Sequence, residues 1–474
     1  MRDHGVPTSL HTRRLARLAL PLALLALALP ASAIALPAPT LFLTTGGSGM
    51  AEGGAGGIAP PSELWRVDPA TGASSSAGGT GYAITGLAQD PTTGVLYAVS
   101  SSLSPIAPRT LLTLNPANAV ATAIGPLGPG VARLADISFN SQGQLFGWDE
   151  EKDNLASVDK ATGAVTVIPS SLSTKGSGVS FDRDDVLWIF NATEEGEFNT
   201  LDTATGAATT KGTLKPIDAN RSPVSAAAWD CERTTLYATL NNRGKPPANL
   251  VTIDTATGAI TNKGTVATGA DGLEWFCPLA FEFTGSGATI AGGKQSLSIP
   301  VIRGPRVKGA ASVVFSTVNG TARAGRDFLA ASGTLSFPNN GTQLALPLTV
   351  TPDPNAGENR TFTVQLSGPS SGGTVGAPFT VTIKAGRPKP ATIKGPKGAA
   401  AGRAAFTLRS NQLPARFLCK LDRGRFKGCG RNSKKGKKFQ TPKLNPGRHK
   451  LVVQVVNRAG LKAKPAKRTF TVLP

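Results

Sequence analysis

The side chains best suited to chemistry in this chain of 474 residues are basic ones near its C-terminus. Residues 389–474 contain 23 Lys or Arg residues and one acidic residue, Asp422, and so carry a net charge of +22 in a chain whose total is +21. Such a patch attracts polyanions because binding releases their counterions, with a steep dependence on salt. The alternative is a basic, soluble surface without a dedicated partner. The densest part comprises Arg423, Arg425, Lys427, Arg431, Lys434, Lys435, Lys437 and Lys438.

Acid–base catalysis has few candidates. The chain has three His residues, and none lies within 34–386. That part therefore has no Ser-His-Asp or Cys-His nucleophile and no His-ligated zinc or iron. Carboxylate pairs could still perform glycosidase chemistry, although the acidic groups lie in expected turns, where solvated acids are ordinary. We expect a non-catalytic protein, with an enzyme that uses such a pair as the alternative. The groups are Asp149, Glu150 and Glu151; Asp182, Asp184 and Asp185; and Glu194, Glu195 and Glu197.

The elements that must position these groups are short strands, because one turn, Asp-x-Ala-Thr-Gly-Ala, recurs along the chain. Asp can accept a hydrogen bond from the backbone two residues on, and Gly supplies the positive φ that closes a hairpin. A period of about 40–50 residues suits a propeller blade. A degenerate copy has Ala119 in place of Gly, so its turn is expected to differ. The copies begin at Asp68, Asn115 (degenerate), Asp159, Asp202 and Asp254.

A second motif has the same period: an apolar strand that ends near Asp, a turn, and Leu-Tyr or a similar pair. Its last copy is expected at 278–282. Counted from Leu41 to Phe283, the chain completes five units of four strands, and four antiparallel strands make a propeller blade. The pattern resembles secreted bacterial propellers with Leu-Tyr and Asp-x-x-Thr-Gly repeats. The resemblance implies a five-bladed β-propeller over 34–283, with the Asp turns on one face, but it does not identify a ligand.

Residues 284–386 read as alternating strands separated by Gly, Pro and Asn turns, as in a β-sandwich. The most distinctive stretches are 296–303, 312–322, 324–328, 332–337 and 361–366. Through these stretches the segment resembles a Calx-beta domain. The resemblance implies an immunoglobulin-like sandwich of the kind found in exchanger regulatory regions and in large microbial surface proteins.

Members of that family can bind calcium through carboxylates at one end of the sandwich, and calcium takes six to eight oxygen ligands. Here the family's early Glu falls at or near Ala291, and its later Glu pair falls at Gly357 and Arg360, whose charge would repel the ion. We therefore expect no cofactor, and keep a calcium-responsive spacer as an alternative. The remaining candidate calcium ligands are Asp327, Asp353 and Glu358.

Residues 387–402, rich in Pro, Gly, Lys and Ala, are expected to form a linker. Residues 403–474 resemble the small immunoglobulin-like domains of exported actinobacterial proteins, through 415–422, 426–429, 444–451 and 457–460. A Cys419–Cys429 disulfide would staple a domain too small to bury a large core.

The other two cysteines, Cys231 and Cys277, would pair by elimination. In the expected repeat, however, Cys231 follows its apolar strand whereas Cys277 precedes the equivalent strand of the next unit. Bridged Cα atoms must lie within about 7 Å, so the pairing stays open at this point.

Residues 1–33 have the basic start, short apolar core and Ala31-Ser32-Ala33 cleavage site of a secretory signal. The sequence therefore predicts a secreted, all-β protein: a five-bladed propeller, a Calx-beta sandwich and a basic, disulfide-stapled immunoglobulin-like domain. We expect non-catalytic binding or adhesion at the bacterial surface. The propeller would present a protein or glycan ligand site. The basic domain would hold anionic envelope polymers or acidic glycans, with no nucleic acid and only peripheral contact with membrane.

Overall fold

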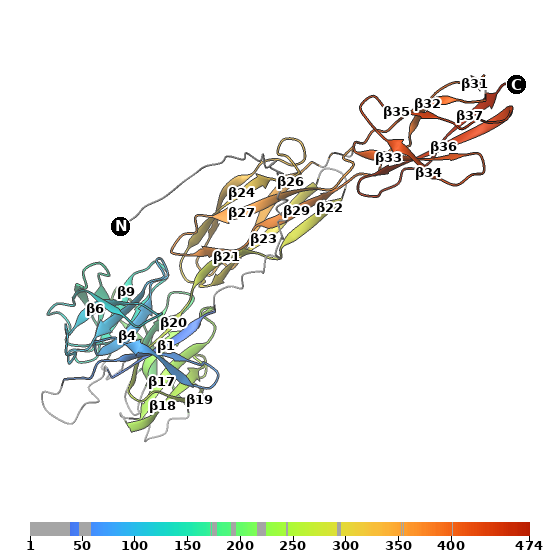
Figure 1. Cartoon of the computed structure of the whole chain (residues 1–474). Helices are drawn as coiled ribbons and strands as arrows, with labels where there is room; N and C mark the ends of the chain where they lie inside the picture. Colours follow the sequence, from blue (N-terminus) through green and yellow to red (C-terminus); the bar gives the residue numbers. More distant parts are fainter. Residues whose placement is uncertain are drawn as a thin grey trace, which may run out of the picture. The chain divides into compact units, whose positions relative to one another are not determined.

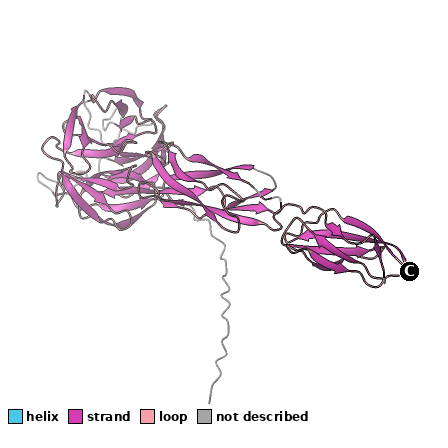
Figure 2. Cartoon of the chain, turned by 90° about the horizontal axis from the view of Figure 1, so that it is seen from above, coloured by secondary structure: helices cyan, strands magenta, loops and turns pink. Residues whose placement is uncertain are grey.

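The computed structural model describes residues 38–46, 58–170, 172, 178–190, 196–215, 224–242, 245–291, 295–351, 353, 355–400 and 402–474. The signal peptide expected over 1–33 lies outside the described residues. Every regular element in the described part is a strand (Figures 1 and 2). Within those ranges, no helix is long and apolar enough to cross a membrane.

Five antiparallel sheets of four strands each make up the N-terminal part, which confirms the expected five-bladed propeller. In each sheet the strands are given from the centre outward. The first blade is β20 (Ala270–Phe276), β1 (Thr40–Thr45), β2 (Glu63–Val67) and β3 (Ser74–Gly79). The second is β4 (Ile84–Gln89), β5 (Leu96–Ser100), β6 (Thr110–Leu114) and β7 (Ala121–Pro126). The third is β8 (Leu134–Phe139), β9 (Leu145–Asp149), β10 (Asn154–Val158) and β11 (Val165–Pro169). The fourth is β12 (Gly178–Phe181), β13 (Leu187–Phe190), β14 (Glu197–Leu201) and β15 (Ala208–Thr213). The fifth is β16 (Val224–Trp229), β17 (Leu236–Asn242), β18 (Lys245–Ile253) and β19 (Ile260–Val266).

The inner strands form a closed ring, since each of β4, β8, β12, β16 and β20 contacts the next and β20 returns to β4. The ring is closed by strands from the two ends of the propeller: β20 pairs with β1, and the amide of Gly272 donates to Oγ1 of Thr44. The inner strands are buried along almost their whole length. The core therefore lies between blades rather than within one blade.

The repeated turns have the expected mechanism. In the first copy, Asp68 Oδ1 accepts from the Ala70 amide and Gly72 has a φ of +75°. A Cβ at Gly72 would lie 2.8 Å from the Thr265 carbonyl oxygen of the neighbouring blade, so Gly is needed for blade packing as well as for φ. The expectation that the degenerate copy differs is wrong. Ala119 has a φ of +62° and its amide donates to the Asn115 carbonyl, as Gly72 does to Asp68.

The assignment of 278–282 to the propeller is wrong, because β21 (Leu279–Phe283) pairs with β23 (Gln295–Pro305) of the sandwich. The inner strand that completes the last repeat is β20, which ends just before Cys277. Cys231 follows β16 and Cys277 follows β20, two neighbouring strands of the ring. The two cysteines form a disulfide with a Cα–Cα distance of 5.6 Å, so the concern about their separation came from the misplaced repeat.

Two packed sheets form the sandwich, around a core that includes Phe281, Phe328, Phe337 and Phe362. One sheet consists of β26 (Gln343–Val350), β23, β21 and β28 (Thr374–Val375). The other consists of β22 (Gly287–Ala291), β29 (Phe379–Lys384), β27 (Arg360–Ser367), β24 (Ala311–Asn319) and β25 (Ser332–Phe337). Residues 306–310, here named the joint loop, connect β23 to β24.

The C-terminal domain is a smaller pair of sheets. One contains β30 (Thr392–Lys394), β32 (Ala405–Arg409) and β35 (Lys437–Gln440). The other contains β31 (Gly398–Ala399), β37 (Ala466–Val472), β36 (Gly447–Asn457), β33 (Ala415–Leu421) and β34 (Lys427–Arg431). The Cys419–Cys429 disulfide joins β33 to β34. Part of the expected linker is strand: β30 pairs with β32, and β31 with β37.

Candidate functional site

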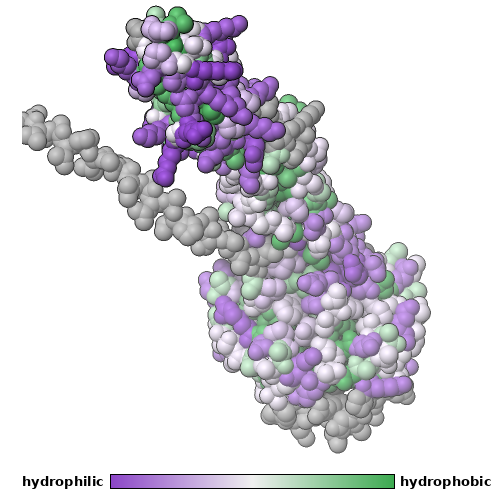
Figure 3. All heavy atoms as spheres, turned by 90° about the vertical axis from the view of Figure 1, so that its right-hand side faces the viewer, coloured by the Kyte–Doolittle hydropathy of each residue, from purple (hydrophilic) through white to green (hydrophobic). Residues whose placement is uncertain are grey.

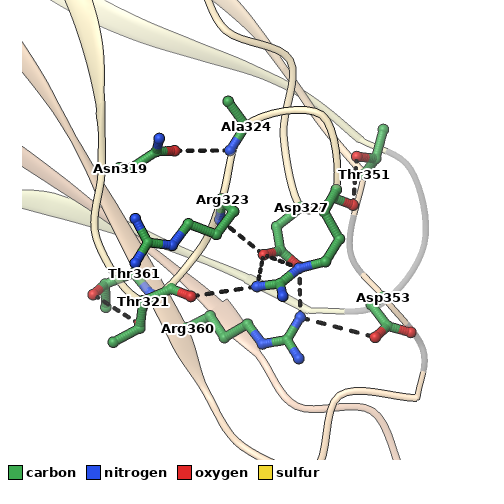
Figure 4. Close-up of polar contacts among 10 residues, drawn as sticks. Asn319, Thr321, Arg323, Ala324, Asp327, Thr351, Asp353, Arg360 and Thr361 are labelled. Atoms are coloured by element: carbon green, nitrogen blue, oxygen red, sulfur yellow. Dashed lines mark hydrogen bonds and ion pairs between the residues drawn. The ribbon is translucent and has the colours of Figure 1, made fainter.

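The first candidate site is the end of the sandwich where the family's calcium ligands would fall. Asp327, in the loop between β24 and β25, is 1% exposed. One carboxylate oxygen accepts from the Arg323 amide and from Nε and Nη2 of Arg326, at 2.9, 2.9 and 2.7 Å. The other accepts from Nη1 of Arg360 at 2.6 Å (Figure 4). Two guanidinium groups therefore hold this carboxylate.

The other two expected ligands also engage arginines. Asp353 lies 3.8 Å from Nη1 of Arg360, and Glu358 lies 3.1 Å from Nη1 of Arg458 in the C-terminal domain. Among the described residues, no group of three or more His, Cys, Asp or Glu side chains is arranged to hold a metal ion. The donor set does not fit calcium, because Arg360 supplies a positive charge beside two of the three carboxylates.

Two opposing effects act on Asp327. Burial raises the pKa of its carboxyl, but hydrogen bonds from Arg326, from the Arg323 amide and from Arg360 outweigh it and hold the pKa below the ordinary value. The folded chain therefore binds a proton here less readily than the unfolded chain. The carboxylate contributes stability above about pH 4, and this contribution is lost as the pH falls through the lowered pKa.

Arg360→Met is expected to lower the free energy of unfolding of the sandwich by about 3 kcal/mol, because it leaves a buried carboxylate with one guanidinium partner fewer. The measurement is differential scanning calorimetry of the full chain. Arg323→Met is the matched control. The Arg323 side chain is exposed in the loop that carries Asp327, and exposed substitutions change stability by less than about 0.5 kcal/mol.

The same calorimetry tests for calcium. A site occupied at 100 times its dissociation constant would add about 2.7 kcal/mol, and we expect millimolar calcium to leave the wild-type transition unchanged. A large upward shift of the sandwich transition with calcium would contradict the conclusion that arginine side chains, rather than a calcium ion, neutralise the carboxylates at this end of the sandwich.

The carboxylates considered for catalysis serve turns. The amide of Ala132 donates to buried Asp149, the indole of Trp188 donates to Asp182, and the amide of Ser141 donates to Asp185. Glu150 forms an ion pair with Arg133. Glu194 and Glu195 lie outside the described residues. Asp182 accepts in its own turn, and the other two bond to neighbouring loops. Asp149 is 0% exposed, so it is not the solvated acid that the sequence led us to expect.

Sequence reasoning missed a cluster of charges where the joint loop meets the propeller. Glu274 of β20, Arg233 and Lys308 of the joint loop line a cavity of about 40 Å³ at the end of the propeller where the inner strands finish. Nζ of Lys308 lies 5.6 Å from the ring centre of Phe181, and Nη2 of Arg233 donates to the Phe181 carbonyl. The available signal was the charge of Glu274 between Leu273 and Trp275, two large apolar residues.

The joint loop is held in shape by one arginine. Arg303, 3% exposed, donates from Nε to the Arg306 carbonyl and from Nη2 to the carbonyls of Lys308 and Gly309. Arg306, also 3% exposed, fits against Gly94 of the propeller, where a Cβ would lie 2.3 Å from Nη1. The loop is therefore ordered by the sandwich and presents Lys308 to the propeller.

The eight basic residues proposed for polyanion binding come from adjoining elements of the C-terminal domain. Arg423 and Arg425 lie in the β33–β34 hairpin, Lys427 and Arg431 at the two ends of β34, Lys434 and Lys435 in the next turn, and Lys437 and Lys438 on β35. Seven of these residues are exposed, and Lys437 is half-buried.

The fold thus defines an all-β chain, in which a propeller is followed by two sandwich domains. Residues 278–388 match the Calx-beta domain family, so the second domain is a Calx-beta domain. No curated protein matches the chain.

Several solved structures are similar to parts of the chain. The apo-form Calx CBD1 domain is 29% identical, with 23% of this chain and 96% of that one covered and a TM-score of 0.22. A nidogen/laminin complex chain is 12% identical, with 50% and 98% covered and a TM-score of 0.35. A streptogramin B lyase is 12% identical, with 45% and 65% covered and a TM-score of 0.28.

Proposed function

We propose that the protein is a secreted, non-catalytic binding or adhesion protein of the bacterial surface. Its C-terminal domain would hold anionic envelope polymers or acidic glycans, and its propeller would present a site for a protein or glycan ligand. The observation that carries the proposal is the uncompensated positive charge of the C-terminal domain.

This charge has almost no internal partner. The one acidic residue of the domain, Asp422, accepts from His449 and from the Lys450 amide. Two ion pairs that involve the domain are found among the described residues, His449–Asp422 and Arg458–Glu358. Hydrophilic side chains crowd the surface of the domain in the view of Figure 3. An exposed excess of this size favours binding to polyanions.

The propeller is proposed as the ligand platform because it has no other evident task. The joint loop covers the end where the inner strands finish and leaves a cavity of only about 40 Å³ there, which is room for water rather than a ligand. We therefore place the ligand at the opposite end, where β4, β8 and β16 begin. A catalytic role keeps less support, since the acids examined above serve turns.

Replacing Lys434, Lys435, Lys437 and Lys438 together with Gln is expected to reduce the salt dependence of binding to anionic cell-wall fragments. Each neutralised phosphate of a duplex-like polyanion adds about 0.9 to the log–log slope, and flexible chains add less. Four lost contacts should therefore lower the slope by about 3. The measurement is a pull-down of the mature chain from low to high salt.

A matched control removes four charges outside this domain, with Lys211→Gln, Lys215→Gln, Lys263→Gln and Lys384→Gln in one chain. It should bind as the wild type does. Equal retention of all three proteins, or binding that is indifferent to salt, would show that the charge is only a solvated surface.

A further inference from the structure

A groove lined by arginines lies at the end of the C-terminal domain where β33 begins and β34 and β36 finish. It has a volume of about 550 Å³ and is lined by Arg416 of β33, Arg431 of β34 and Arg458, just after β36. All three arginines are exposed. The groove is therefore accessible, concave and positively charged.

The placement of two of these arginines is unfavourable by itself. Arg416 and Arg431 are directly opposite each other in the β33–β34 pair. Like charges directly opposite on neighbouring strands destabilise a sheet, and within the described part of the chain neither has an ion pair. An anion seated between them would remove the repulsion, so the pair has the features of a binding position rather than of a structural contact.

The floor of the groove is rigid. Asn457 is 3% exposed, its amide group donates to the carbonyl of Gly386 and to Oε1 of Gln412, and its Oδ1 accepts from the Leu461 amide. The turn that carries Arg458 is fixed by a hydrogen bond from the Ala459 amide to the Gly357 carbonyl and by the Arg458–Glu358 ion pair. The arginines are thus mounted on a preorganised frame, which lowers the cost of ordering on binding.

The lysine run lies on the other side of the edge strand β34. Arg431 pairs with exposed Arg416, whereas Gly430 pairs with buried Phe417, and the stem of Lys437 lies over Gly430, 2.4 Å from the place of a Cβ. Because neighbouring residues of a strand point to opposite faces of the sheet, Lys437 approaches β34 from the face opposite to the groove. A ligand that binds both positions must carry anionic groups at intervals, as an extended polymer does.

We propose that the groove between Arg416, Arg431 and Arg458 is the specific subsite for one carboxylate or phosphate group of an extended polyanion. The planar guanidinium fork binds carboxylate and phosphate in a bidentate manner, whereas a Lys ammonium acts as a point charge. The inference rests on the proposed function. It adds a binding position whose affinity depends on the geometry of the guanidinium groups rather than on net charge alone.

The test keeps the charge constant. Arg416→Lys with Arg431→Lys in the full mature chain should lower affinity by about tenfold, because the forks are lost while the charges stay. Arg403→Lys with Arg448→Lys is the matched control, because both arginines are exposed in the same domain but belong neither to the groove nor to the eight basic residues, and its affinity should stay within about twofold of wild type. The probes are polygalacturonate, which carries carboxylates, and poly(glycerol phosphate), which carries phosphates. Isothermal titration calorimetry at two salt concentrations gives affinity and salt slope.

The outcomes separate the two proposals. If the wild type binds neither probe, the proposed function fails and the subsite with it. If the wild type binds but both Arg→Lys variants bind equally well, the subsite is wrong while the proposed function stands. If the variant with Arg416→Lys and Arg431→Lys loses affinity for only one of the two probes, that probe identifies the anionic group that the groove binds. Circular dichroism of each variant verifies that the domain is folded.

Discussion

Replacing Lys308 with Met is expected to make the propeller less stable as the pH rises, whereas replacing Glu274 with Gln is expected to make it less stable as the pH falls. Each single change leaves one half-buried charge beside the cavity without its counterpart. The double variant is expected to lose both pH dependences, because neither titrating group remains.

The opposite signs follow from proton binding. Burial raises the pKa of Glu274 to about 8, against the pull of Lys308 and Arg233. Burial, reinforced by repulsion from Arg233, lowers the pKa of Lys308 well below its ordinary value. While both groups are present, they share one proton in the folded chain, and the unfolded pair also binds one between about pH 5 and pH 10. The wild type should therefore show little pH dependence from this pair.

Without Lys308, folded Glu274 binds a proton more readily than unfolded Glu, so stability is lost as the pH rises from about 5 through 8. Without Glu274, folded Lys308 binds a proton less readily than unfolded Lys, so stability is lost as the pH falls below about 10. Each slope can reach about 1.4 kcal/mol per pH unit.

Urea unfolding at pH 5.5, 7 and 8.5, followed by tryptophan fluorescence, measures these slopes. All five tryptophans lie in the propeller, at positions 65, 148, 188, 229 and 275, so the signal reports on that domain alone. Slopes of the same sign in the two single variants would contradict the coupling between the joint loop and the propeller.

Removal of the Cys231–Cys277 bridge, by Cys231→Ala with Cys277→Ala, is expected to lower the free energy of unfolding of the propeller by about 4 kcal/mol. The bridge spans 46 residues, and a closed loop of that length restricts the unfolded chain by about this amount. For a domain of this size the midpoint should fall by about 8–16 °C.

Tryptophan fluorescence during heating measures this change. Cys419→Ala with Cys429→Ala is the matched control, because it opens a disulfide of the C-terminal domain and should leave the propeller signal unaltered. An unchanged midpoint in the first variant would mean that the pairing of β20 with β1 closes the ring without help from the disulfide.

The repeat pattern predicted the propeller well because each blade depends on local features: an apolar strand, an Asp turn and a Leu-Tyr pair. It failed where pairing is not local. The segments 270–276 and 278–282 are both short enough to be single strands, and they are separated by one residue. Only the partner differs, and the partner of β20 is β1, at the far end of the propeller. Nothing in the local pattern specifies that partner.

The φ of Ala119 and the clusters of charged side chains were predicted less well, because they also depend on contacts between segments far apart in the sequence. Ala119 takes the positive φ of a glycine because the hydrogen bond of its turn and the space left by Gly78 of the neighbouring blade outweigh a backbone cost of about 1–2 kcal/mol. The Glu274–Lys308 cluster joins residues of different domains. The arginines around Asp327 were partly foreseeable, since Arg360 falls where the family has Glu, but the role of Arg326 needs the shape of the loop.

The closure of the ring by β20 and β1 has a consequence for biosynthesis. A chain that emerges N-terminus first produces β1, β2 and β3 long before β20. Because β3 ends at Gly79 and β20 begins at Ala270, the first blade must wait for its central strand until the 190 residues between them have been made. Meanwhile β1 presents an unpaired edge, which is a template for association with other chains. Joining segments so distant also slows folding. Chaperone binding during synthesis would therefore matter most for residues 40–79, and the disulfide to Cys277 can form only when synthesis has passed the last blade.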